Sequence, residues 1–65
     1  MNMEEKIIKS LENGPLGTLS ISKKVCGAKG TKSQVNPTLY VMEKKDLLLH
    51  YQIENVHVWS LKTTI

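Results

Sequence analysis

The stretch Thr31–Lys45, TKSQVNPTLYVMEKK, predicts a helix with two different faces, and the rest of the chain is organised around it. Val35, Leu39 and Met42 recur at i, i+4 and i+7, the spacing that places apolar side chains on one side of a helix. Such an apolar stripe has to be buried. We therefore expect this helix to pack against a core supplied by the remaining segments.

A second, polar stripe runs along the same predicted helix. Lys32, Asn36 and Tyr40 recur at i, i+4 and i+8 and so fall on a common face. An ammonium, an amide and a phenol offer charge, hydrogen bonds and a flat aromatic surface, which suit a phosphate backbone with a base or sugar beside it. The stripe favours an exposed Tyr40 at a nucleic-acid contact over a tyrosine in the core.

The start of this helix has two competing signals. Thr31 followed by Gln34 has the form of a capping box. Asn36-Pro37 is also a start signal, because Pro is favoured at the first helical position. We favour the start at Thr31, with a kink or a 3₁₀ turn before Pro37, since a proline inside a helix removes one hydrogen bond.

Two shorter helices are expected before it. The first runs from Met3 to Asn13, is capped by Asn2 and buries the apolar residues Ile7, Ile8 and Leu11. A linker or edge segment, Leu16–Thr18, follows. The second helix starts at Thr18 or Ser20, ends at Cys26 and buries Leu19, Ile21 and Val25.

The C-terminal part of the chain has the alternation of a β-hairpin. Leu47–Ile53 and Val56–Leu61 are rich in residues that favour strands and are separated by Glu54-Asn55. On the second strand, His57, Trp59 and Leu61 share one face. A tryptophan there is most often a core anchor. We expect the chain to fray from Lys62 onward.

Three helices followed by a hairpin indicate an α+β fold, a winged helix-turn-helix. In that fold the third helix is the recognition element and the hairpin is the wing. The length of 65 residues allows one domain.

The charge, the cysteine count and the absence of catalytic motifs restrict the classes of function that fit this chain. The net charge is +3, and all nine basic residues are lysine, so the chain is better equipped to hold phosphates than to read guanine through arginine. The single Cys26 allows neither an internal disulfide nor a metal cluster. Because no nucleophile elbow, Walker loop or zinc spacing is present, we expect no catalytic residues, no metal and no cofactor.

The pattern Asn36-x-x-Leu39-Tyr40, with Lys32 one turn earlier and Trp59 in the last strand, resembles the Zα family of Z-DNA- and Z-RNA-binding domains. Members of this family occur in an RNA-editing adenosine deaminase, an innate-immune nucleic-acid sensor, a fish protein kinase and poxvirus interferon antagonists. The likeness covers most of the chain. It implies that residues 1–65 form a single Zα-like winged-helix domain taken from a larger protein.

The resemblance also implies roles for individual residues. Asn36 would bond a backbone phosphate, Lys32 would contact neighbouring phosphates, and Tyr40 would lay its ring against a syn base. Trp59 would buttress Tyr40 and reach a phosphate with its indole N–H. The nucleic-acid-binding set that it implies is Lys32, Ser33, Asn36, Tyr40, Asn55, His57 and Trp59.

The chain departs from the family pattern in two places. Pro37 stands where members often have a basic residue, which removes one phosphate contact. Val56 and His57 stand where the family wing usually has Pro-Pro, so the rigid apolar contact is weakened and His57 offers a polar, pH-dependent one instead.

We therefore expect a non-enzymatic module that binds left-handed double-stranded DNA or RNA and stabilises the Z conformation. It would act in the cytoplasm or nucleus without a membrane, as a monomer in isolation, with two copies able to share one duplex. One alternative is a winged-helix regulator that binds B-form DNA. Another is a protein-interaction domain whose apolar wing, around Ile53, Val56 and Val58, pairs with another chain.

Overall fold

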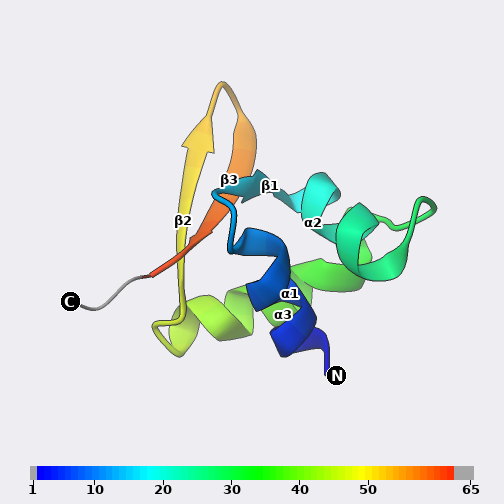
Figure 1. The fold of residues 1–65 in the computed structure, drawn as a ribbon. Helices are drawn as coiled ribbons and strands as arrows, with labels where there is room; N and C mark the ends of the chain where they lie inside the picture. Colours follow the sequence, from blue (N-terminus) through cyan, green and yellow to red (C-terminus); the bar gives the residue numbers. More distant parts are fainter. Residues whose placement is uncertain (1, 63–65) are drawn as a thin grey trace.

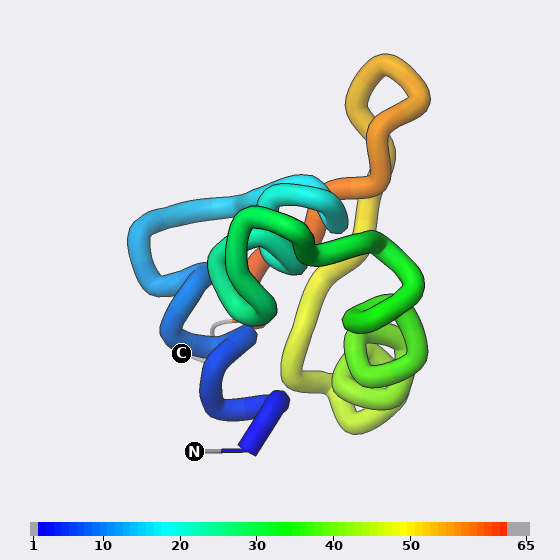
Figure 2. The backbone as a smooth tube through the Cα atoms, turned by 90° about the vertical axis from the view of Figure 1, so that its right-hand side faces the viewer, coloured from blue at the N-terminus to red at the C-terminus, as the bar shows by residue number. Residues whose placement is uncertain are grey.

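The computed structural model describes residues 2–62 as three helices and a three-stranded antiparallel sheet (Figure 1). The elements are α1 (Met3–Leu11), β1 (Leu16–Gly17), α2 (Thr18–Cys26), α3 (Lys32–Lys44), β2 (Leu48–Ile53) and β3 (Val56–Leu61). This is the predicted α+β, winged-helix arrangement. The hairpin β2–β3 is the wing, and its turn projects beyond the helices (Figure 2).

The apolar stripe of α3 forms the centre of the core, as predicted. Val35, Leu39 and Met42 are completely buried. The remaining buried apolar residues come from α1, α2, β2 and β3: Ile7, Leu11, Ile21, Leu48 and Trp59. Burying an aliphatic side chain of this size stabilises a fold by about 1.5–3 kcal/mol, so a small domain depends heavily on each one.

The start of α3 follows the capping-box signal. Thr31 is the N-cap, and its backbone N–H donates to the side-chain oxygen Oε1 of Gln34 at 2.8 Å. Pro37 lies inside the helix, which is α-helical from Lys32 to Lys44. The expected 3₁₀ turn before Pro37 is therefore wrong. Proline removes only the bond to the carbonyl of Ser33, an exposed residue whose carbonyl can turn to solvent.

The first two helices have slightly different limits from those predicted. Asn2 caps α1 as expected, accepting the N–H of Glu5 at 2.8 Å, but the helix ends at Leu11 rather than at Asn13. Helix α2 begins at Thr18, the earlier of the two predicted starts. Leu19 is 40% exposed and does not belong to its buried side, because it lies in the first turn, away from the core.

The sheet has one more strand than the predicted hairpin. The segment expected to be a linker or edge, Leu16-Gly17, pairs with β3, and the strand order is β1-β3-β2. Glu54 and Asn55 both have positive φ, 50° and 69°, which is the two-residue type I′ turn that matches the twist of a hairpin.

The chain remains paired at Lys62, where we expected fraying to begin. Its backbone N–H donates to the carbonyl of Leu47 at 3.1 Å, and its Nζ lies 2.7 Å from Oδ1 of Asp46. The rest of the predicted frayed end, residues 63–65, lies outside the described residues.

Leu39→Ala should lower the free energy of unfolding by about 2–5 kcal/mol, because it leaves a cavity at a completely buried site of α3. Val41→Ala is the matched control, since Val41 lies on the same helix but is 46% exposed, and it should change stability by less than about 0.5 kcal/mol. Urea unfolding followed by tryptophan fluorescence measures both. Equal losses in the two variants would contradict the assignment of the buried stripe.

Candidate nucleic-acid interface

A single hollow brings most of the predicted contact residues together. It lies between the start of α2, one face of α3 and the wing, and its volume is about 370 Å³. Five of the seven residues predicted from the sequence line it: Lys32, Asn36, Tyr40, Asn55 and His57. Ser33 and Trp59 are not among its lining residues.

Helix α3 supplies three of these side chains from successive turns. Lys32, Asn36 and Tyr40 lie at i, i+4 and i+8, so the helical repeat alone puts them in a row. Lys32 is exposed, Asn36 is half-buried, and Tyr40 is 43% exposed. The prediction that Tyr40 is exposed rather than part of the core is confirmed, and its role in contacting a ligand stays a prediction.

The Tyr40 ring is held by two aromatic neighbours. It meets Trp59 edge to face, with ring centroids 5.3 Å apart and planes at 85°. It meets His50 in the same way at 5.6 Å and 84°. Edge-to-face pairs of this kind contribute about 0.5–1.5 kcal/mol beyond their buried area, so they restrict the ring while part of it faces solvent.

Trp59 differs from its predicted role as a phosphate ligand. It is completely buried, and its Nε1–H donates to Oγ1 of Thr18 at 2.9 Å. That N–H is therefore engaged inside the protein and is not exposed to a ligand. The tertiary reason is β1, which pairs Leu16 with Trp59 and brings the start of α2 over the indole.

Ser33, which was also predicted to contact nucleic acid, lies outside the hollow. It is exposed on α3, outside the hollow, and its hydroxyl oxygen lies 3.2 Å from the hydroxyl oxygen of Thr31. One of the two hydroxyls donates to the other, so Ser33 takes part in the start of the helix.

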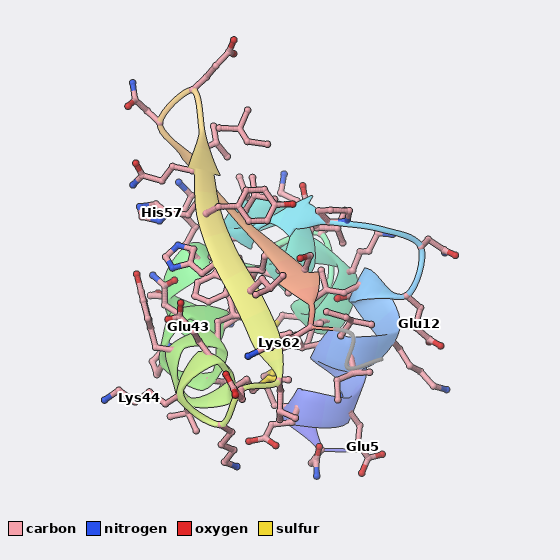
Figure 3. All side chains as sticks on the ribbon, turned by 90° about the vertical axis from the view of Figure 1, so that its left-hand side faces the viewer. Glu5, Glu12, Glu43, Lys44, His57 and Lys62 are labelled. Carbon is pink, nitrogen blue, oxygen red and sulfur yellow. The ribbon has the colours of Figure 1, made fainter. Side chains whose placement is uncertain are left out.

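The wing carries a chain of polar contacts that the sequence analysis did not find. Nδ1 of His57 lies 2.7 Å from Nε2 of His50, so one imidazole donates and the other accepts. On the far side, Nε2 of Gln52 lies 3.2 Å from Nε2 of His57. Nδ1 of His50 in turn lies 3.7 Å from Oε2 of Glu43 on α3. Figure 3 shows His57 and Glu43 on the same side of β2.

His50 therefore positions the two aromatic residues and the wing histidine. Its ring stacks on Trp59 with centroids 4.0 Å apart and planes at 4°. The register, with His50 opposite Trp59 and Gln52 opposite His57, places these side chains on one face of the hairpin. Alternation along the strand shows that His50 and Gln52 share one face of β2. The sequence could have placed them beside Trp59 and His57 only if the register of the hairpin had been known.

The beginning of α2 also lines the hollow, through Gly17, Thr18, Leu19 and Ser20. Gly17 is the N-cap and supplies no side-chain hydrogen bond, and the first turn of α2 contains no acidic residue. The first amides of a helix lack intrahelical partners and carry the positive end of its dipole. None of the described lining residues is acidic, so the hollow is suited to an anion.

Comparisons with known proteins give no relative: no family model, curated protein or solved structure matches this chain. Among the described residues, no helix is long and apolar enough to cross a membrane. The same part of the chain holds no group of three or more histidine, cysteine or acidic side chains placed to bind a metal ion.

Thr18→Val should lower the free energy of unfolding by about 1–3 kcal/mol, because the buried indole N–H of Trp59 loses its acceptor. Thr18→Ser keeps an acceptor and should lose less. Thermal unfolding followed by circular dichroism compares them. If valine is tolerated as well as serine, the hydrogen bond does not hold Trp59 in place.

Proposed function

We propose that this chain is a Zα-like, non-enzymatic module that binds left-handed double-stranded nucleic acid through the hollow between α2, α3 and the wing. The observation that carries the proposal is the exposed ring of Tyr40, fixed against buried Trp59 and lying in one hollow with Lys32 and Asn36. A fixed aromatic surface beside an ammonium and an amide suits a base flanked by phosphates.

Each group has a distinct part in the proposed contact. Lys32 supplies a point charge to phosphate oxygens, and the amide of Asn36 donates a hydrogen bond to a neighbouring phosphate. Tyr40 presents its ring to a base in the syn conformation, which the left-handed duplex offers. Asn55 and His57 contact the backbone from the wing. Trp59 acts from inside the protein, by holding Tyr40.

Selectivity in this scheme comes from shape. The residues that line the hollow include no arginine, the side chain that most often reads guanine in the major groove. Phosphate contacts made by lysine are insensitive to base identity and weaken as salt rises. The domain shifts a duplex toward the left-handed form only as far as its affinity for that form exceeds its affinity for the right-handed one.

Circular dichroism of an alternating C-G duplex, titrated with the domain, tests the proposal. We expect the right-handed spectrum to convert to the left-handed one, with a smaller conversion at higher salt. A second titration starts from a duplex already held in the Z form by bromination and measures affinity without the cost of conversion. Absence of binding to both duplexes, or tighter binding to a B-form competitor in a gel shift, would exclude the proposed function.

Tyr40→Ala should weaken binding to the brominated duplex by about 5- to 150-fold, the equivalent of losing about 1–3 kcal/mol of aromatic–base contact. Tyr40→Phe is the matched control, because it keeps the ring against Trp59 and should keep most of the affinity. Fluorescence anisotropy measures binding, and thermal unfolding checks the fold. An alanine variant that binds normally would remove Tyr40 from the site.

Asn36→Ala should weaken binding by about 10- to 150-fold, the equivalent of losing about 1.5–3 kcal/mol from one hydrogen bond to a charged group. Its melting temperature should be close to that of the original chain, because Asn36 is only half-buried. Thr38→Ala, a half-buried position of α3 outside the hollow, is the control for the helix itself.

A further inference from the structure

The two histidines of the chain form one hydrogen-bonded pair on the wing. His50 lies on β2 and His57 on β3, and the sequence contains no other histidine. Nε2 of His50 lies 2.7 Å from Nδ1 of His57, and the two ring planes differ by only 29°. Of the two rings, only that of His57 lines the hollow. The pair therefore joins a side chain of the hollow to the imidazole that stacks on Trp59.

The amide of Gln52 fixes the direction of this hydrogen bond. Its Nε2 lies 3.2 Å from Nε2 of His57, and an amide nitrogen only donates. Nε2 of His57 is therefore an acceptor, so a neutral His57 carries its hydrogen on Nδ1 and donates it to His50. Because His50 accepts at Nε2, its own hydrogen is on Nδ1, 3.7 Å from Oε2 of Glu43. The contacts of the neutral pair thus run in one direction, from an amide to a carboxylate.

In this state the His57 ring has no N–H free for a phosphate. Its Nδ1–H is donated to His50, and its Nε2 holds a lone pair that accepts from Gln52. A phosphate oxygen needs a donor. The phosphate contact proposed for His57 therefore requires an additional hydrogen on that ring.

The geometry limits where an additional hydrogen can be placed. Two neutral imidazoles have four ring nitrogens and two hydrogens. In the pair, one hydrogen is on Nδ1 of His50 and one lies between the rings, so Nε2 of His57 is the site left for a third. A fourth would place two hydrogens in the 2.7 Å gap between the rings and break their bond. The pair therefore takes up a single proton, which appears as an Nε2–H on the histidine that lines the hollow.

We propose that nucleic-acid binding in the hollow is coupled to the uptake of one proton by the His50–His57 pair, so that affinity rises as the pH falls. This inference rests on the proposed function. A protonated imidazole is a charged donor, and charge-assisted hydrogen bonds to phosphate are the stronger kind. The phosphate replaces the amide of Gln52 at Nε2 of His57. Imidazole is the side-chain group that ordinarily changes charge between about pH 5 and pH 8, so the contact is switched in that range.

The other titratable groups that face the pair come from α3. The carboxylate of Glu43 lies beside His50 and favours an added positive charge. Lys32 shares the hollow with His57 and opposes that charge, whereas the phenol of Tyr40, which meets His50 edge to face, is a neutral group in this pH range. Strand β1, the start of α2 and the hairpin turn contribute no lysine or carboxylate to the lining. A bound phosphate offsets the repulsion from Lys32, so phosphate and proton increase each other's affinity.

Fluorescence anisotropy with the brominated C-G duplex, repeated at constant salt between about pH 8 and about pH 5.5, tests the coupling. The Kd should fall by about 10- to 150-fold as the pH is lowered, the range for one hydrogen bond to a charged group. The change should not exceed about tenfold per pH unit, because only one proton is taken up. A Kd that is the same at every pH overturns the coupling and leaves the proposed function in place. Absence of binding at every pH overturns both.

Isothermal titration calorimetry counts the protons. Binding to the same duplex at about pH 7 is measured in two buffers that differ in their enthalpy of ionisation, and the difference in heat gives the number of protons taken up. We expect a net uptake that does not exceed one proton per domain. Zero uptake or a release of protons overturns the proposal.

His57→Asn removes the titrating ring and keeps an amide that can donate to His50. His57 is exposed, so the variant should keep a native circular dichroism spectrum. Its Kd should stay constant over the pH range, which also controls for any effect of pH on the duplex. A variant whose affinity rises with acid as much as that of the original chain overturns the assignment to the histidine pair.

Nitrogen-15 NMR of the imidazole rings examines the free protein. At about pH 8 both rings should carry their hydrogen on Nδ1, and acid should add one hydrogen, at Nε2 of His57. Gln52→Glu replaces the donor at that atom by a carboxylate and should raise the midpoint of the titration by about one pH unit. Leu49→Glu adds the same charge on the other face of β2 and should leave the midpoint nearly unchanged. Two histidines that each take up a proton independently overturn the proposal, whether or not nucleic acid binds.

Discussion

The burial of Trp59 is the constraint on which the rest of the structure depends. Its indole is completely enclosed, and its N–H needs an acceptor, which Thr18 at the start of α2 supplies. Its backbone lies in the central strand, between β1 and β2. One side chain therefore fixes the wing, the short first strand and the beginning of α2 with respect to α3. A buried donor without a partner would be costly, so these elements are held together by a specific bond as well as by apolar packing.

The same residue determines what the surface presents. His50 stacks flat on the indole and Tyr40 meets it edge to face, so an exposed phenol ring is backed by a rigid neighbour. Lys32 reaches the hollow from an exposed position and has no such support. The hollow thus combines one fixed aromatic surface with a flexible charge. An ordered ring loses little entropy when a base stacks on it, whereas a lysine tolerates variation in phosphate position.

The short strand β1 makes the two edges of the β2–β3 hairpin different. By pairing with β3 it covers one edge of the hairpin and carries the chain directly into α2. The opposite edge, on β2, has no corresponding segment, and its exposed apolar side chains remain uncovered within the described chain. The fold therefore separates two surfaces. One is the hollow beside α3, which has Lys32 and no acidic side chain among its lining residues, and the other is the outer face of the hairpin, where Leu49, Tyr51, Ile53 and Val56 are exposed.

Local patterns in the sequence determined the helices, the hairpin and the two stripes of α3. Periodicity places Val35, Leu39 and Met42 together whatever surrounds them, and it aligns Lys32, Asn36 and Tyr40 in the same way. Only the tertiary structure decided that the indole of Trp59 is buried and bonded to Thr18, and that Leu16-Gly17 pairs with β3. A two-residue strand has no period of its own, and the acceptor for the indole N–H is Thr18, 41 residues away in the chain. The contact of His50 with His57 likewise depended on the register of two strands. Long-range pairings of this kind are selected by the packing of the whole core, which no short window of sequence contains.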